Sequence, residues 1–191
     1  ATSAVGPGRE ALALALREGR SGLRRNDFGD GATNDARLDC WIGRVEGLET
    51  LQLPAPLGPW DSRNNRLAWL ALEQDGRRDA INAVIARHGA ERVAVIVGTS
   101  TSSIGSTEAA YTQLDDGEFT ADFARPHVHT PHSLGEFVAQ ATGLRGPCIT
   151  VATACSSSAK VFAQAARMID AGLADAALVG GVDTLCGSVL F

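Results

Sequence analysis

The chain contains little lysine, no excess of positive charge and no long apolar run. Lys160 is the single lysine among 17 basic residues, which we interpret as a bias of genomic composition and not as a functional feature. The formal net charge is −5 and the pI about 5.3, which argues against a general nucleic-acid binder. The alanine and leucine run at residues 11–16 is far shorter than the ~18 residues that a membrane span needs. We therefore predict a globular protein with no membrane span and no nucleic-acid partner.

Paired cysteine motifs are missing as well. The four cysteines are Cys40, Cys148, Cys155 and Cys186; none forms a C-x-x-C pair, and no histidine stands at zinc-ligand spacing from them. An even number of cysteines could form two disulfides, but no secretory signal peptide is recognisable, so we expect reduced thiols and a cytoplasmic location. With 191 residues, 45% of them hydrophobic and 20% charged, the chain is large enough for one domain with a real core.

Helical and strand-like segments both occur along the chain, which we interpret as an α/β fold. We expect helices over residues 8–18, 64–74, 78–88 and 133–142 and from Thr107, and strands over residues 38–45, 93–97, 149–153 and 176–179. The continuous apolar run at residues 93–97 is typical of a central parallel strand. Residues 20–35 are rich in Gly, Asn and Asp and predict a loop. The three prolines within residues 53–59 predict a surface connection without regular structure.

The most informative stretch joins a strand, a sharp turn and a helix around Cys155. Residues 149–153 form a β-branched run typical of a buried strand, and the serines at 156–158 are good helix-starting residues because their hydroxyls can accept from the first N–H groups. The helix then carries an apolar stripe and ends at Gly172; the stripe consists of Val161, Phe162, Ala165, Ala166 and Ile169. A second apolar strand follows and is closed by Gly180 and Gly181.

A thiol at such a turn is suited to nucleophilic chemistry. The positive end of the helix dipole and the nearby N–H groups favour the thiolate, lower the pKa of the thiol and can stabilise an oxyanion. The alternative is that Cys155 is a small buried hydrophobic residue, as most free cysteines are. The spacing by itself leaves both interpretations open.

Two other stretches suggest binding sites. The hydroxyl-rich residues 99–107 could cradle a phosphate, but they lack the Gly-x-x-x-x-Gly-Lys pattern and are equally typical of a tight loop before a helix. His127, His129 and His132 could bind a metal, but two prolines interrupt them and no carboxylate is placed by spacing. We expect hydrogen-bonded loop histidines there, and neither a metal nor a cofactor.

The segment around Cys155 closely resembles the active-site segment of the β-ketoacyl-[acyl-carrier-protein] synthases, in the thiolase-like superfamily. The resemblance rests on residues 153–159, Thr-Ala-Cys-Ser-Ser-Ser-Ala, and on the later Gly-Gly-Val-Asp at residues 180–183. Residues 2–6, 18–22 and 93–100 also resemble segments of this family. The likeness is greater to the elongating synthases than to the thiolases or the initiating synthases.

The resemblance implies the N-terminal half of a layered αβαβα fold, with a mixed five-stranded sheet clad by helices, and a β-ketoacyl synthase N-terminal domain over residues 1–191. It implies that Cys155 holds an acyl group, which condenses with a malonyl carrier as carbon dioxide is lost. The two histidines that serve decarboxylation in the family belong to its second half, so His127, His129 and His132 do not inherit that role. Apolar faces that would meet the second half are expected to be exposed.

The implied partners are an acyl carrier protein, acyl and malonyl thioesters, and a second subunit in a homodimer or heterodimer. Arg17, Arg20, Arg24 and Arg25 could dock an acidic carrier protein, although ordinary solvated surface charge is the stronger expectation. Two further functions remain open. The chain could be a non-catalytic synthase-like partner or fragment, against which the presence of Cys155 argues, or a thiolase-like acyltransferase that uses coenzyme A.

Overall fold

A three-stranded parallel sheet forms the centre of the molecule. The computed structural model describes residues 1–28, 38–114, 116–121 and 125–190. The strand order is β6 (Cys148–Val151), β5 (Val93–Gly98), β7 (Ala176–Gly181). Gly98 pairs with Val151 on one side and with Gly181 on the other, so the carboxyl ends of all three strands meet at one edge of the sheet. Cys155 follows β6 at this edge.

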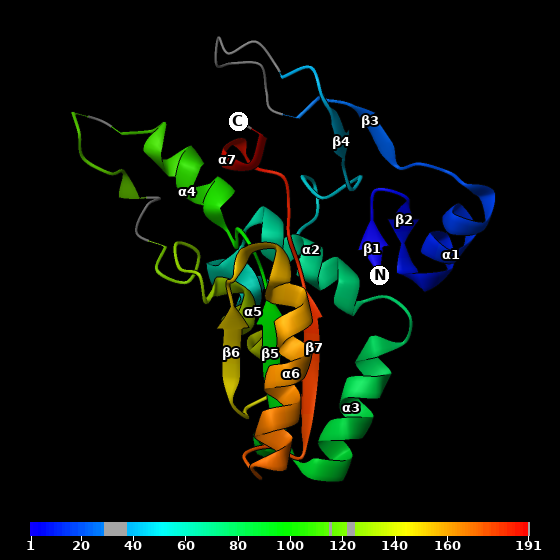
Figure 1. Ribbon diagram of the computed structural model, residues 1–191. Coiled ribbons are helices and arrows are strands. Elements are labelled where there is room, and N and C mark those ends of the chain that lie inside the picture. The colour runs from blue at the N-terminus through cyan, green and yellow to red at the C-terminus, as the bar shows by residue number, and fades with distance from the viewer. Residues whose placement is uncertain (29–37, 115, 122–124, 191) are drawn as a thin grey trace.

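Helices cover both faces of this sheet (Figure 1). One face packs against α2 (Arg63–Leu72), α3 (Arg77–His88) and α5 (Ser133–Thr142), and the other against α6 (Ser157–Asp170). Successive side chains of a strand point to opposite faces, so Val95 and Val97 meet α5 while Ala94 and Ile96 meet α6. All four are buried, which explains the continuous apolar run of β5.

Smaller elements surround this unit. The antiparallel pairs are β1 (Thr2–Ser3) with β2 (Gly6–Pro7) and β3 (Leu23–Arg25) with β4 (Trp41–Gly43). The remaining helices are α1 (Gly8–Glu18), α4 (Ile104–Tyr111), α7 (Gly187–Leu190) and the 3-10 turns η1 (Ala55–Trp60), η2 (Ala90–Arg92) and η4 (Ala154–Ser156). Within the described ranges, no helix has the length and apolar character that crossing a membrane requires.

Several predictions of single elements are confirmed. The helices expected at residues 8–18 and 133–142 have these bounds in the structure. Each ends at a glycine in the left-handed region, Gly19 with φ 61° and Gly143 with φ 73°, where a side chain would be strained. The apolar run at residues 93–97 is the central strand of a parallel sheet, as predicted.

Other local predictions are wrong. The stretch predicted as a loop at residues 20–35 includes β3, and its residues 29–37 lie outside the described part of the chain. The proline-rich stretch includes η1, because Pro54 and Pro56 stand at the start of the 3-10 turn, where a missing N–H leaves no bond broken. The strand expected over residues 38–45 is only three residues long, and α4 begins at Ile104, not at Thr107.

The strand and helix that flank Cys155 are more exposed than predicted. β6 is an edge strand, and its residues are exposed or only partly buried. The buried face of α6 consists of Ser157, Val161, Ala165 and Met168. Phe162 is 62% exposed and Ile169 41% exposed, because they point away from the sheet.

The implied mixed sheet of five strands also differs from what the described residues form, which is three parallel strands and two separate antiparallel pairs.

Candidate active site

Cys155 lies exposed on the turn that joins β6 to α6. The preceding Ala154 has φ 52°, a left-handed conformation that costs a residue with a Cβ roughly 1 kcal/mol or more. A strained residue persists only where neighbouring contacts hold it. Here the Thr153 N–H donates to Ser157 Oγ at 2.9 Å, and Ser157 Oγ lies 2.7 Å from the Ala154 carbonyl oxygen. The predicted position of Cys155 at a sharp strand-to-helix turn is therefore confirmed.

The serines at the start of α6 act differently from the prediction. Ser156, the N-cap residue, does not accept from an N–H of the helix; its hydroxyl donates to the Thr153 carbonyl oxygen at 2.9 Å. Ser157 also serves the turn, but its hydroxyl oxygen accepts the Thr153 N–H at 2.9 Å. No side chain caps the start of α6, and its first N–H, that of Ser157, donates to the Ala154 carbonyl oxygen; what this end of the helix offers an anion or a polarised carbonyl oxygen is the positive end of the helix dipole.

Two glycines let the first turn of α6 approach the sheet closely. A Cβ on Gly98, the last residue of β5, would lie 2.7 Å from the carbonyl carbon of Ser157. A Cβ on Gly181, the last residue of β7, would lie 1.9 Å from Ser158 Oγ and 2.8 Å from Ser158 Cβ. Any side chain at these positions would push the helix away, so the two glycines determine where the Cys155 turn stands relative to the strand ends.

Asp183 of the Gly-Gly-Val-Asp segment binds the loop that follows β5. Its Oδ1 accepts from the Ser100 N–H at 2.6 Å and from Thr99 Oγ1 at 3.1 Å, and its Oδ2 lies 3.4 Å from Ser100 Oγ. The segment that resembles the synthase family therefore joins the ends of β5 and β7 beside the Cys155 turn.

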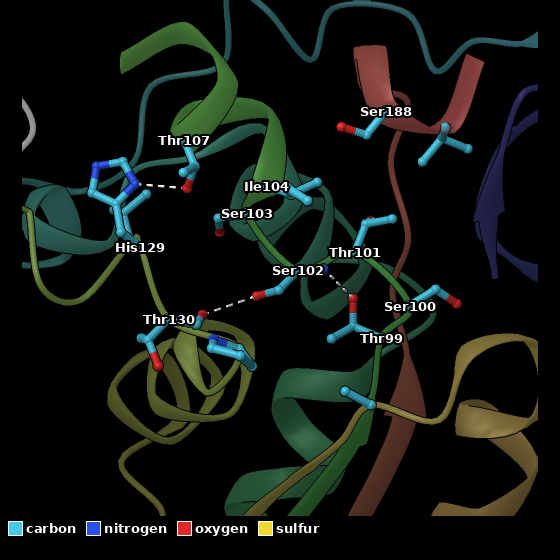
Figure 2. A pocket seen from close by; sticks show the side chains of 14 residues that line it. Thr99, Ser100, Thr101, Ser102, Ser103, Ile104, Thr107, His129, Thr130 and Ser188 are labelled. Atoms are coloured by element: carbon cyan, nitrogen blue, oxygen red, sulfur yellow. Dashed lines mark hydrogen bonds between the residues drawn. The ribbon is translucent and has the colours of Figure 1, made fainter. Parts of the chain in front are cut away.

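A cavity of about 420 Å³ opens beside the same strand ends (Figure 2). Its lining is formed by residues 99–104, Thr107, residues 128–131, Ala152, Ser188 and Val189. Ser102 donates its N–H to Thr99 Oγ1 at 2.8 Å and its hydroxyl to the Thr130 carbonyl at 3.3 Å, as the dashed lines in Figure 2 show. The hydroxyls of Thr99 and Ser102 are thus used to shape the wall. The cavity reaches Ala152, three residues before Cys155.

Two buried hydroxyl groups behind this wall, those of Ser62 and Ser133, escaped the sequence analysis. Ser62 Oγ lies 2.8 Å from Ser103 Oγ, and Ser133 Oγ accepts from Asn65 Nδ2 at 2.9 Å. These residues come from the start of α2, the loop before α4 and the start of α5. Serines are normally exposed, so no local pattern marks them as core residues. Their hydrogen bonds join the cavity wall to the helix layer.

The histidines point to separate partners. His127 Nδ1 lies 3.3 Å from Glu136 Oε2, and its ring stands 4.6 Å from the Trp60 ring. His129 Nδ1 lies 2.8 Å from Thr107 Oγ1, and burial together with the nearby Arg125 lowers the pKa of this imidazole. Among the residues that the structure describes, no three His, Cys, Asp or Glu side chains meet in an arrangement that could hold a metal ion.

The cysteines differ in their surroundings. All four are unpaired. Burial, reinforced by the charge of Glu136, raises the pKa of the Cys148 thiol, whose sulfur lies against Gly135 of α5. Burial also raises the pKa of the Cys186 thiol, with a smaller contribution from Glu108. Both thiols are therefore less easily ionised than an ordinary cysteine.

The arginines considered for carrier docking are partly engaged within the chain. Arg20 lies 3.4 Å from Glu18, Arg24 lies 2.9 Å from Asp27, and Arg25 pairs with Asp39. Arg25 also stacks over Trp41 at 5.1 Å. These exposed ion pairs are the ordinary surface charge that the sequence analysis favoured, and they weaken the case for a dedicated docking patch.

Comparison with known proteins identifies a family for this chain. The family described as beta-ketoacyl synthase, N-terminal domain, matches residues 64–191. Nodulation protein E of Rhizobium meliloti (strain 1021) is 34% identical over 182 residues, which cover 88% of this chain and 41% of that protein. The chain spans less than half the length of the first curated relatives that it matches, 43% and 41%.

Solved structures give the same result for the fold. A ketosynthase from Xenorhabdus doucetiae, solved in complex with its chain length factor, is 33% identical with a TM-score of 0.79, over 96% of this chain and 45% of that chain. A beta-ketoacyl synthase from Burkholderia phymatum STM815 has a TM-score of 0.74 at 23% identity, over 98% of this chain and 46% of that chain. The implied thiolase-like condensing-enzyme fold is thereby confirmed. Since the matched family covers more than half of the chain, the chain belongs to the β-ketoacyl synthase family, whose N-terminal domain it matches.

Proposed function

We propose that this chain supplies the nucleophilic half of a β-ketoacyl-[acyl-carrier-protein] synthase, with Cys155 as the residue that carries the acyl group. The observation that supports this most directly is the exposed position of Cys155 on a strained turn immediately before α6. A non-catalytic partner has no need for a thiol held in this way. The adjacent N-terminus of α6, with no side chain capping it, is suited to stabilise developing negative charge on an acyl carbonyl oxygen.

The proposed reaction has two stages. In the first, the Cys155 thiolate attacks the carbonyl carbon of an acyl thioester on the carrier protein, and the carrier thiol leaves as the acyl group becomes a thioester of Cys155. In the second, a malonyl carrier loses carbon dioxide, and the electron pair of the broken carbon–carbon bond attacks the Cys155 thioester. The new carbon–carbon bond gives a β-ketoacyl carrier and releases the Cys155 thiolate. Residues for decarboxylation are expected from a second half of the enzyme.

Residues 1–191 on this proposal form the N-terminal domain, and the second half covers the outer face of α6. This outer face consists of Phe162, Ala166 and Ile169 on α6 and Leu173 just after it, and all four side chains are exposed. A helix that is apolar on two faces requires a partner on each. The sheet supplies the first partner, and the greater length of the relatives supports a second layer of the same protein or of another chain.

A heterodimer is the assembly that we favour, with an acyl carrier protein as the donor. The Xenorhabdus ketosynthase was solved with its chain length factor, which supports a synthase-like second subunit for this chain also. The cavity beside Ala152 is proposed to take the acyl chain, because Ile104, Val128 and Val189 give it apolar walls next to the Cys155 turn. Coenzyme A thioesters are the competing donors.

The test is the intact mass of the full-length protein that contains this domain, together with its second subunit, before and after incubation with an acyl-carrier thioester. We expect one acyl adduct that maps to Cys155, no adduct in Cys155→Ala, and an unchanged adduct in the control Cys148→Ala. Equal loading of Cys155→Ala would overturn the assignment. Faster loading from acyl coenzyme A than from the acyl carrier would identify a thiolase-like acyltransferase, and no loading of the native protein would identify a non-catalytic partner.

A further inference from the structure

Asp183 stands at the centre of the hydrogen bonds that follow the strand ends. It lies two residues after β7, and its carboxylate receives the N–H of Ser100 at 2.6 Å and the hydroxyl of Thr99 at 3.1 Å. The side chain is exposed, so it does not serve the core. Its contacts all lie on the loop that leaves β5.

Thr99 connects this carboxylate to both neighbouring strands. Thr99 is completely buried, and its N–H donates to the Val151 carbonyl oxygen, at the end of β6, at 3.1 Å. Its hydroxyl, besides donating to Asp183, accepts the N–H of Ser102 at 2.8 Å. Its carbonyl oxygen lies 3.2 Å from Ser157 Oγ. Every polar atom of Thr99 is thus occupied, and a shift of this residue is transmitted to its partners.

Ser157 is the partner that belongs to the Cys155 turn. Its hydroxyl oxygen accepts the Thr153 N–H at 2.9 Å, and its single proton has two carbonyls in reach, Ala154 at 2.7 Å and Thr99 at 3.2 Å. The Thr99 carbonyl shares the Ser157 proton with Ala154, so a shift of this carbonyl changes how Ser157 is held, and Ser157 holds the backbone on either side of Ala154. A continuous path of hydrogen bonds leads from Asp183 through Thr99 and Ser157 to the turn.

We propose that Asp183 is a positioning residue for Cys155, which acts through Thr99 and Ser157 without touching the acyl group. This inference rests on the proposed function, in which Cys155 is the nucleophile. A carboxylate suits the role because one oxygen accepts two donors at once and the second oxygen faces the Ser100 hydroxyl. Asparagine would keep the first oxygen, and alanine would lose every contact.

The experiment compares Asp183→Ala and Asp183→Asn in the full-length protein with its second subunit. We expect the maximal rate of acyl loading to fall about tenfold in Asp183→Ala, which corresponds to the loss of one charge-assisted hydrogen bond. The maximal loading rate of Asp183→Asn should lie between those of the native protein and Asp183→Ala. The KM for the acyl carrier should stay unchanged, because Asp183 orients the nucleophile and binds no substrate. A native loading rate in Asp183→Ala, or a rise in KM at constant maximal rate, would overturn the proposal.

Asp175→Ala is the matched control. Asp175 precedes β7, at the opposite end from Asp183, and its carboxylate pairs with Arg92 at 2.6 Å. The Asp175→Ala variant, like Asp183→Ala, loses an exposed carboxylate and its hydrogen bonds, but at the far edge of the sheet. Asp175→Ala should load at the native rate. If slow loading came from a general loss of stability, Asp183→Ala and Asp175→Ala would both load slowly. That result would also contradict the proposal.

A double variant tests the path itself. If Asp183 acts through Ser157, then Asp183→Ala should slow loading much less in a Ser157→Ala background than in the native background. If the loading rate of the double variant fell by the product of the two single effects, Asp183 and Ser157 would act separately. Iodoacetamide labelling of Cys155 separates this proposal from the proposed function. Even if the native protein takes no acyl group, Asp183→Ala should slow labelling of Cys155 relative to Cys148, and an unchanged ratio would overturn the positioning role.

Discussion

Ser157 Oγ accepts the backbone N–H of Thr153 at 2.9 Å, so that one side chain closes the turn on which Cys155 stands. The two residues are four positions apart, so this hydrogen bond is local in sequence. The same hydroxyl touches the Thr99 carbonyl, which is distant in sequence. The turn is thereby connected to the end of β5, so a change at either place should alter the position of the Cys155 thiol.

Replacement of Ser157 by alanine should loosen this turn. We expect Ser157→Ala to lower the free energy of unfolding by about 1 kcal/mol, since the partly buried N–H of Thr153 loses its acceptor, and to slow acyl loading of Cys155. Urea unfolding and intact-mass kinetics measure the two effects. Ser158→Ala is the control, because the Ser158 side chain is exposed and belongs to the same helix turn. Loading at the native rate in Ser157→Ala would show that the turn needs no such support.

Gly181 should tolerate no side chain. In Gly181→Ala the new Cβ would meet the Cβ of Ser158 at 2.8 Å, a contact that side-chain rotation cannot relieve, so the first turn of α6 has to move. We expect a loss of about 1–3 kcal/mol in the free energy of unfolding, as for other overpacked sites, and impaired loading. Gly180→Ala is the matched control, because a Cβ there meets nothing within 4 Å. Thermal unfolding of both variants decides the matter, and equal stability of the two would refute the close approach.

The outer face of α6 should govern the behaviour of the isolated chain. Phe162 is 62% exposed, and its replacement by serine removes a large apolar side chain from that surface. We expect Phe162→Ser to reduce self-association of residues 1–191, as measured by light scattering, and to weaken association with the second half in the full-length enzyme. Arg167→Ser, an exposed polar position on the same helix, should change neither. Reduced self-association without any effect on the full-length enzyme would place the second half elsewhere.

Cysteine labelling should be selective near neutral pH. The pKa values of Cys148 and Cys186 are raised, so both thiols stay protonated at about pH 7 and react slowly with iodoacetamide, Cys148 even though it is an exposed residue. We expect Cys155, which is exposed at the start of α6, to react first. Raising the pH ionises Cys148, so its labelling should accelerate and the selectivity should shrink. Peptide mass mapping over a pH series follows each thiol. Labelling of Cys148 as fast as Cys155 near neutral pH would contradict this order.

The same series can test the causes of the Cys148 shift. The carboxylate of Glu136 disfavours a second negative charge, so Glu136→Gln should lower the pKa of Cys148 and speed its labelling at a given pH. Glu91→Gln, which changes a carboxylate paired with Arg145, should leave Cys148 unaffected. An equal rate in both variants would leave burial as the sole cause.

Ile104 should influence which acyl chains are accepted. It lines the 420 Å³ cavity and is only partly covered by neighbours. We expect Ile104→Phe to fill part of this space and to shift loading toward shorter acyl groups, whereas Ile104→Val should preserve the native preference. Competition between carrier thioesters of different length, read by intact mass, reports the change. An unaltered preference in Ile104→Phe would place the acyl chain outside this cavity.

Elements whose signals are local can be predicted from the amino-acid sequence. The apolar run of β5 predicts a central strand because both of its faces are buried, and Gly19 and Gly143 mark helix ends because only glycine is unstrained there. The turn at Cys155 was predictable for the same reason, since a β-branched run is followed directly by helix-starting residues and a helical stripe. The family resemblance also depends on contiguous residues.

Contacts between distant segments follow from the three-dimensional packing and could not be predicted from local sequence. Asp183 meets Thr99 and Ser100 across more than eighty residues of sequence, and Gly181 meets Ser158, because parallel strands bring their carboxyl ends to one edge. Burial was decided at the same level. The stripe of α6 includes Phe162 and Val161 alike, and the position of the sheet alone buries Val161 and leaves Phe162 exposed. Periodicity identifies an apolar face, but the packing partner determines which part of it is covered.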